Sequence, residues 1–141
     1  MAASQYIYSE GCLRPQYLNY VIWENGSFRV LANQSELSAA YAPILTKDEA
    51  LSYALAATGL AAYFDLQVPD TYRFFTKRLE DSHVEVTPDG YIVHLYHYQL
   101  CGCGPHTTTA VEILVHQDGR LKELSRTSVF EDPEQDGLCI D

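Results

Sequence analysis

The sequence predicts an α+β domain in which an antiparallel β-meander wraps one main helix. Three observations predict it. An Asn25-Gly26 pair separates two β-rich runs, a capping box begins at Thr46, and strand-like runs joined by turns follow from residue 83 to residue 130. The expected order is an N-terminal β-hairpin, one or two helices, and then four strands of antiparallel meander.

The N-terminal hairpin is predicted from residues 17–24 and 27–32, which are rich in aromatic and β-branched side chains. Asn25-Gly26 lies between these runs. Both residues of such a turn adopt positive φ, which asparagine and glycine tolerate best, so Asn-Gly is a strong hairpin signal.

Two helices are expected next. The first begins at Asn33, whose side chain caps the helix, and ends before Pro43. The second begins at Thr46, whose hydroxyl accepts from the Glu49 amide while the Glu49 carboxylate bonds back to Thr46. Gly59 suits the left-handed position after its last turn. We expect this second helix to lie across the sheet.

The remaining chain predicts a meander, because turn residues separate its strand-like runs. In the third strand, alternate residues from Thr109 to Val115 are expected to form the buried face. The expected strands span residues 83–87, 91–100, 107–116 and 121–130, with turns at 88–90 and 117–120 and a loop at 101–106. A helix followed by such a meander shares the outline of cystatin-like and NTF2-like folds. That outline does not define a function.

The length of 141 residues favours one domain. We expect residues 1–16 to form a tail or extended arm, since Pro15 argues against regular structure there. Residues 17–130 then form the single α+β domain. Residues 131–141 are acidic and contain a proline and a glycine, which predicts an acidic tail.

The charge balance restricts the partners. Nine Lys and Arg residues against 19 Asp and Glu residues give a net charge of −10. Such a surface repels the phosphates of nucleic acid and anionic membranes, so we expect neither as a partner. An unidentified protein or small ligand, a basic one in particular, suits this charge better.

The cellular compartment depends on the N-terminus. Residues 1–11 lack the charged and apolar regions of a signal peptide, and no run approaches the ~20 apolar residues of a membrane span. As written, the chain is expected to be cytoplasmic. It would be an exported protein if a leader has been removed.

Four cysteines are candidates for disulfides: Cys12, Cys101, Cys103 and Cys139. Four cysteines allow three pairings. Pairing each terminal cysteine with one of Cys101 and Cys103 would attach both tails to one strand end. In a reducing cytosol the same thiols would stay free or bind metal.

The segment Cys101-Gly-Cys103-Gly-Pro-His106 is the most unusual in the chain. Alternation along an extended strand places His97 on the same face as Cys101 and Cys103, and His106 can fold back through the Gly-Pro turn. Two sulfurs and two nitrogens suit tetrahedral zinc, although C-x-C is shorter than the usual C-x2-4-C spacing. A redox pair is a further alternative, although such pairs usually read C-x-x-C.

Tyrosine supplies the candidate binding surface, since the chain has 11 tyrosines. Tyr91, Tyr96 and Tyr98 on the second meander strand are candidates for an aromatic surface, with cross-strand packing as the alternative.

The chain contains none of the P-loop, G-x-S-x-G, G-x-G-x-x-G or H-E-x-x-H motifs. We therefore expect a non-catalytic binding or protein-interaction module. The alternative is a zinc-binding or thiol-dependent protein centred on the Cys101–His106 loop.

Overall fold

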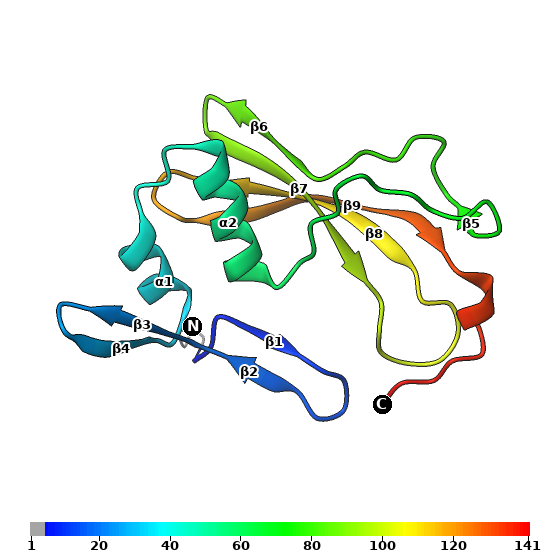
Figure 1. Cartoon of the computed structure of the whole chain (residues 1–141), viewed down its shortest axis with the longest axis horizontal. Coiled ribbons are helices and arrows are strands. Elements are labelled where there is room, and N and C mark those ends of the chain that lie inside the picture. Colours follow the sequence, from blue (N-terminus) through cyan, green and yellow to red (C-terminus); the bar gives the residue numbers. More distant parts are fainter. Residues whose placement is uncertain (1–4) are drawn as a thin grey trace.

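A computed structural model describes residues 5–141 of the chain. Within them, strands and helices form three antiparallel sheets and one helical pair (Figure 1). In chain order the elements are β1 (Tyr8–Glu10), β2 (Gln16–Leu18), β3 (Tyr20–Glu24), β4 (Ser27–Leu31), α1 (Gln34–Tyr41), α2 (Lys47–Thr58), β5 (Arg73–Phe74), β6 (His83–Thr87), β7 (Gly90–Tyr98), β8 (Thr108–Val115), β9 (Leu121–Glu131) and the 3-10 turn η1 (Pro133–Gln135).

The main sheet has the strand order β5-β9-β8-β7-β6 and is antiparallel throughout. The predicted four-stranded meander is present as β6 to β9, and the short strand β5 adds a fifth member beside β9. Register shifts between β8 and β9 at Thr108/Thr109 and Glu112/Ile113 mark irregular pairing. Because such bulges increase local twist, they help to curl the sheet into a half-barrel.

Helix α2 packs against the inner face of this sheet, over β6, β7 and β8 (Figure 1). Its buried face carries Ala50, Ala54 and Ala57, whose small side chains let the helix approach the strands closely. Val93 and Leu95 of β7 are fully buried opposite it. On the predicted inner face of β8, Thr109 is half-buried and the other three residues are buried: Val111, Ile113 and Val115.

The outer face of the sheet has its own small core. Tyr96, Val129 and Phe130 are buried there beneath apolar residues of the connection between α2 and β6. Ala61 in this connection forms a two-way backbone bridge with Tyr96. The connection therefore passes from the helix to the outer face and covers one end of it.

The β3–β4 hairpin turns at Asn25-Gly26 as predicted, with φ of 51° and 79° at the two residues. Both φ values are positive, as a tight two-residue hairpin turn requires. One face of this hairpin packs on the core through half-buried side chains. The opposite face exposes four large apolar residues: Val21, Trp23, Phe28 and Val30.

The ends of the chain are more ordered than an arm and a tail. Residues 8–18 form a second hairpin, in which β1 pairs with β2, and residues 1–4 of the expected arm lie outside the described residues. At the other end, β9 extends to Glu131 and η1 follows. Long-range contacts accompany both differences. The end of β9 pairs with β5, and disulfides attach each end of the chain to the loop after β7.

Both helices begin where the capping signals predict. The Asn33 side chain accepts from the Glu36 amide, and the Thr46 hydroxyl accepts from the Glu49 amide. The reciprocal bond differs by one residue, because the Glu49 carboxylate accepts from Leu45 rather than from Thr46. No helix in residues 5–141 is long and apolar enough to cross a membrane.

Leu95 tests whether the contact between α2 and the sheet supports the fold. Its side chain is 1% exposed, so Leu95→Ala leaves a cavity and is expected to lower the free energy of unfolding by about 2–5 kcal/mol. Denaturant unfolding measures the change. Leu124→Ala, at a position 41% exposed on β9, is the control. Equal effects of the two substitutions would contradict the placement of the core.

Candidate functional site

Both tails are attached to the loop that follows β7. Disulfides join Cys12 to Cys101 and Cys103 to Cys139, so each terminal cysteine is paired with one member of the central pair. Between the two bridges, Gly102 and Ile140 exchange two backbone hydrogen bonds of 2.8 and 3.1 Å. The C-terminal segment is thus fixed to the loop by covalent and hydrogen bonds together.

His106 reinforces this attachment. The ring is 1% exposed, and its Nδ1 and Nε2 atoms lie 2.7 and 2.8 Å from the carbonyl oxygens of Gln99 and Leu138. A carbonyl oxygen only accepts, so the doubly protonated ring satisfies both contacts. The bonds to Leu138 and then to Gln99 accordingly raise the pKa of His106 above its ordinary value.

The predicted zinc set of His97, Cys101, Cys103 and His106 is not formed, which corrects that expectation. Both sulfurs are bonded to other sulfurs, and both His106 nitrogens face carbonyl oxygens. Within residues 5–141, His97 makes no hydrogen bond to any of these groups. The same pairing leaves no thiol for a thiol-dependent reaction or for a dithiol pair between Cys101 and Cys103.

The three predicted surface tyrosines also do not form one surface. Tyr91 is buried on the inner face with the core around α2. Tyr96 is buried on the outer face and donates to the Glu80 carbonyl. Tyr98 is half-buried and donates to the Gln135 side chain at 2.8 Å. Strand alternation explains the difference, since odd and even positions of β7 point to opposite faces.

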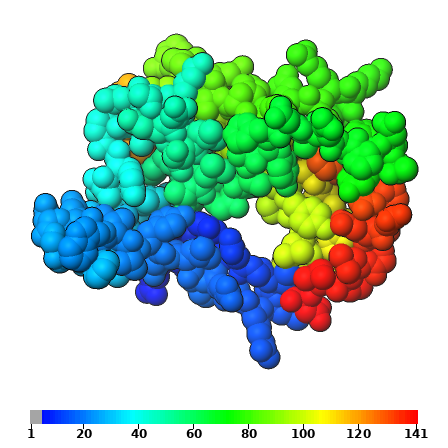
Figure 2. Space-filling view, viewed as in Figure 1, coloured from blue at the N-terminus to red at the C-terminus, as the bar shows by residue number. Residues whose placement is uncertain are grey.

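A cleft lies between the β1–β2 hairpin and the end of β7. Figure 2 shows the hollow, bordered by the blue N-terminal segment, the green segment after α2 and the yellow loop after β7. Its volume is about 730 Å³. The lining comes from three segments and one further residue, namely residues 8–11, 14 and 16, residues 58–61 and 63, residues 96–101, and Arg126.

The disulfide Cys12–Cys101 closes this cleft, because it connects the tip of the β1–β2 hairpin to the loop after β7. At the opposite end, Gly59 lies directly against the Tyr8 ring. A Cβ atom on Gly59 would come within 2.5 Å of that ring, and Gly59 has a φ of 70°. A residue without a side chain therefore both ends α2 and lets the hairpin approach the helix.

His97 is the predicted site residue in the cleft whose polar side chain makes no hydrogen bond within residues 5–141. Its ring is half-buried and has no hydrogen-bond partner within residues 5–141. Burial, and then the neighbouring charge of Arg126, lower the pKa of His97. The neutral ring can accept one hydrogen bond and donate another. The Arg126 guanidinium is itself paired with Glu123 at 2.6 Å.

Sequence reasoning located one wall of this cleft and missed the other two. Residues 96–101 lie within the stretch that the sequence singled out, whereas residues 8–16 had been expected to form an arm. The presence of Cys12 in that arm was the available signal, because a disulfide from Cys12 to the loop had to bring the arm against β7. No family model, curated protein or solved structure matches the chain.

His106 predicts a stability difference that depends on pH. Because the folded-state pKa is raised above the ordinary 6.5, its contribution is fully present below about pH 6.5 and is lost as pH rises through the folded-state pKa. We therefore expect the Tm difference between the wild type and His106→Gln to be larger near pH ~5.5 than near pH ~8.5. A difference that grows with pH would contradict the assigned contacts. Thermal unfolding at both pH values provides the measurement.

The disulfides predict a thiol count and a stability loss. Denatured, unreduced protein should show no reactive thiol, and reduction should release all four. The double variant Cys12→Ser with Cys101→Ser is expected to lose about 2–4 kcal/mol of unfolding free energy, because its unfolded chain is less constrained. Thiol titration and denaturant unfolding test the two parts. Reactive thiols before reduction would rule out the pairing.

Proposed function

We propose that the chain is a non-catalytic binding module whose cleft beneath the β1–β2 hairpin takes a small amphipathic ligand. The observation that carries the proposal is a cleft of about 730 Å³ with an unpartnered, half-buried imidazole in its wall. Small-molecule sites commonly have volumes of about 300–1,000 Å³ and combine apolar walls with a few polar groups.

The lining indicates the chemistry of the ligand. Tyr8, Tyr63 and apolar residues after α2 offer surface for an aromatic or aliphatic body. His97 offers one acceptor or donor inside. Arg126 is balanced by Glu123, the lining also holds Glu10 and Arg14 with opposite charges, and the chain carries a net charge of −10. These charges favour a neutral or weakly basic ligand and disfavour polyanions such as nucleic acid.

Binding also fits the surroundings of His97 better than acid–base catalysis does. Within residues 5–141 its ring has no hydrogen-bonded carboxylate or nucleophile to orient it, whereas catalytic bases usually have both. The alternative of zinc or thiol chemistry at the Cys101–His106 loop is not retained, because the sulfurs are paired. A protein partner on the same surface stays the second possibility for the ligand.

Two disulfides favour an oxidising compartment, so we infer that the protein works after export rather than in the cytoplasm. The disulfides support this because cytosolic reductants keep such thiols reduced. The finer likeness to cystatin-like or NTF2-like folds stays a prediction. What supports it is the helix packed into a curled antiparallel sheet.

Three probes of similar size test the cleft: 2-phenylethanol, phenethylamine and 3-phenylpropionate share one aromatic ring and differ in charge. Amide chemical shifts measured by NMR should change at residues 58–61 and 97–101. The alcohol and the amine are expected to bind more tightly than the carboxylate. His97→Leu should weaken alcohol binding by about tenfold, because one hydrogen bond is worth ~1 kcal/mol or somewhat more.

His116→Leu provides the matched control, because His116 lies outside the cleft lining. It should bind all three probes as the wild type does. Shift changes centred on the exposed β3–β4 hairpin, or equal binding by the wild type and His97→Leu, would refute the proposed site.

A further inference from the structure

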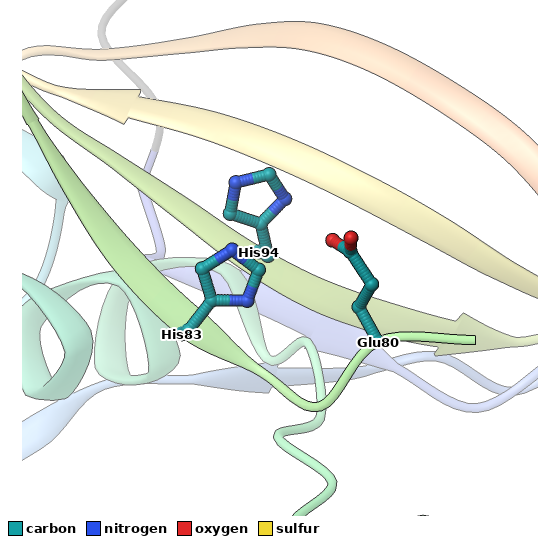
Figure 3. A group of neighbouring side chains, drawn as sticks. All are labelled: Glu80, His83 and His94. Atoms are coloured by element: carbon teal, nitrogen blue, oxygen red, sulfur yellow. The ribbon is translucent and has the colours of Figure 1, made fainter. Parts of the chain in front are cut away.

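A second group of polar side chains gathers at the outer face of the main sheet, away from the cleft. Glu80, His83 and His94 each offer one ligand atom, and these atoms lie within 4.8 Å of one another. Figure 3 shows the two imidazole rings and the Glu80 carboxylate bordering a common space. Glu80 is exposed and the two histidines are half-buried.

Strand register places the histidines together. His83 on β6 lies opposite His94 on β7, and His94 lies opposite Glu112 on β8. The two rings stack with centroids 4.0 Å apart and planes 14° apart. Because direct cross-strand pairs on one face have close Cβ atoms, the sheet holds this arrangement without help from a ligand.

Glu80 comes from the connection before β6, and that connection is anchored beside the histidines. The Tyr96 hydroxyl donates to the Glu80 carbonyl. Two residues further on, Ser82 exchanges hydrogen bonds with Tyr63 at 2.9 and 3.0 Å. The Asp81 carboxylate accepts from the amides of residues 65 and 66. The backbone that carries Glu80 is therefore fixed, while its side chain can rotate.

The second nitrogen of each ring already has a partner of the kind that metal-bound histidines use. His83 Nδ1 lies 2.7 Å from the Asp81 carbonyl oxygen, so Nδ1 donates and Nε2 keeps its lone pair. His94 has Glu85 at 3.0 Å from Nε2 and Glu112 at 3.4 Å from Nδ1. Whichever nitrogen of His94 binds an ion, the other keeps a carboxylate partner, which orients the ring.

Charge and space also favour a cation. Three carboxylates surround the two imidazoles: Glu80, Glu85 and Glu112. Glu80 is also paired, at 3.7 Å, with the exposed cationic side chain of Arg78. Beside the group lies a small cavity of about 130 Å³, lined by Glu80, His94 and Glu112 among others. It has room for water molecules that would complete the coordination of an ion.

We propose that Glu80, His83 and His94 form a binding site for a divalent transition metal, with Zn²⁺ as the preferred ion. Two imidazoles and one carboxylate suit zinc, whereas calcium and magnesium prefer oxygen ligands alone. Tetrahedral ligands at about 2.0–2.1 Å from zinc are ~3.3 Å apart, so binding requires a small inward movement. The exposed Glu80 side chain can move inward, and the two imidazoles must also rotate, because the in-plane lone pairs of nearly parallel rings do not converge on one ion. A neighbouring carboxylate or water takes the fourth position.

The test uses untagged full-length protein that has been stripped with chelator and dialysed. Titration calorimetry with Zn²⁺ should give one equivalent bound, and Co²⁺ should give the intense visible bands of a four-coordinate site. His83→Gln, His94→Gln and Glu80→Gln should each weaken Zn²⁺ binding by at least about tenfold. Binding should also weaken as pH falls and the imidazoles become protonated.

His116→Gln is the control, because it removes an imidazole that directly follows β8 and lies outside this group. It should bind Zn²⁺ as the wild type does. Far-UV circular dichroism tests whether each variant is folded. Failure of the wild type to bind one equivalent, or unchanged affinity in any of the three variants, overturns the assignment. Neither result bears on the cleft around His97.

Discussion

The burial of α2 in the concave face of the sheet is the contact on which the other features depend. Its alanine face lets the helix lie close to β7 and β8, and the sheet curls around it. The helix ends at Thr58, whereas β7 runs on to Tyr98 on the far side of the helix end. The strand therefore extends beyond the helix that covers it. The cleft lies beside the part of β7 that extends beyond the helix, under the β1–β2 hairpin.

The two disulfides fix the two ends of the chain, which the hydrophobic core alone does not hold in place. The β1–β2 hairpin and the C-terminal segment that follows β9 are both short. Cross-links that span 89 and 36 residues keep both segments beside the loop after β7. His106 adds two hydrogen bonds at the same place. The loop is thus a structural junction between the two ends of the chain.

Strand β7 separates two kinds of chemistry on its two faces. His97 points to the inner side, where the ring is half-buried beside the cleft and burial lowers its pKa. His94 points to the outer side, where carboxylates flank both ring nitrogens. The two histidines are three residues apart, but alternation places the sheet between them. A ligand in the cleft and a cation at the outer face would thus not compete for a residue.

Local signals in the sequence determined the elements: the Asn25-Gly26 turn, the caps at Asn33 and Thr46, and the four strands of the meander all lie where short-range patterns place them. These signals act over about four residues, through turn conformations and side chain to backbone hydrogen bonds. Tertiary structure alone decided which terminal cysteine pairs with which member of the central pair, the β1–β2 hairpin, strand β5, the cleft and the grouping of Glu80 with two histidines. Each of these depends on which distant segments come into contact. That choice is set by the shape of the packed core and by strand register across the sheet, neither of which a local pattern contains.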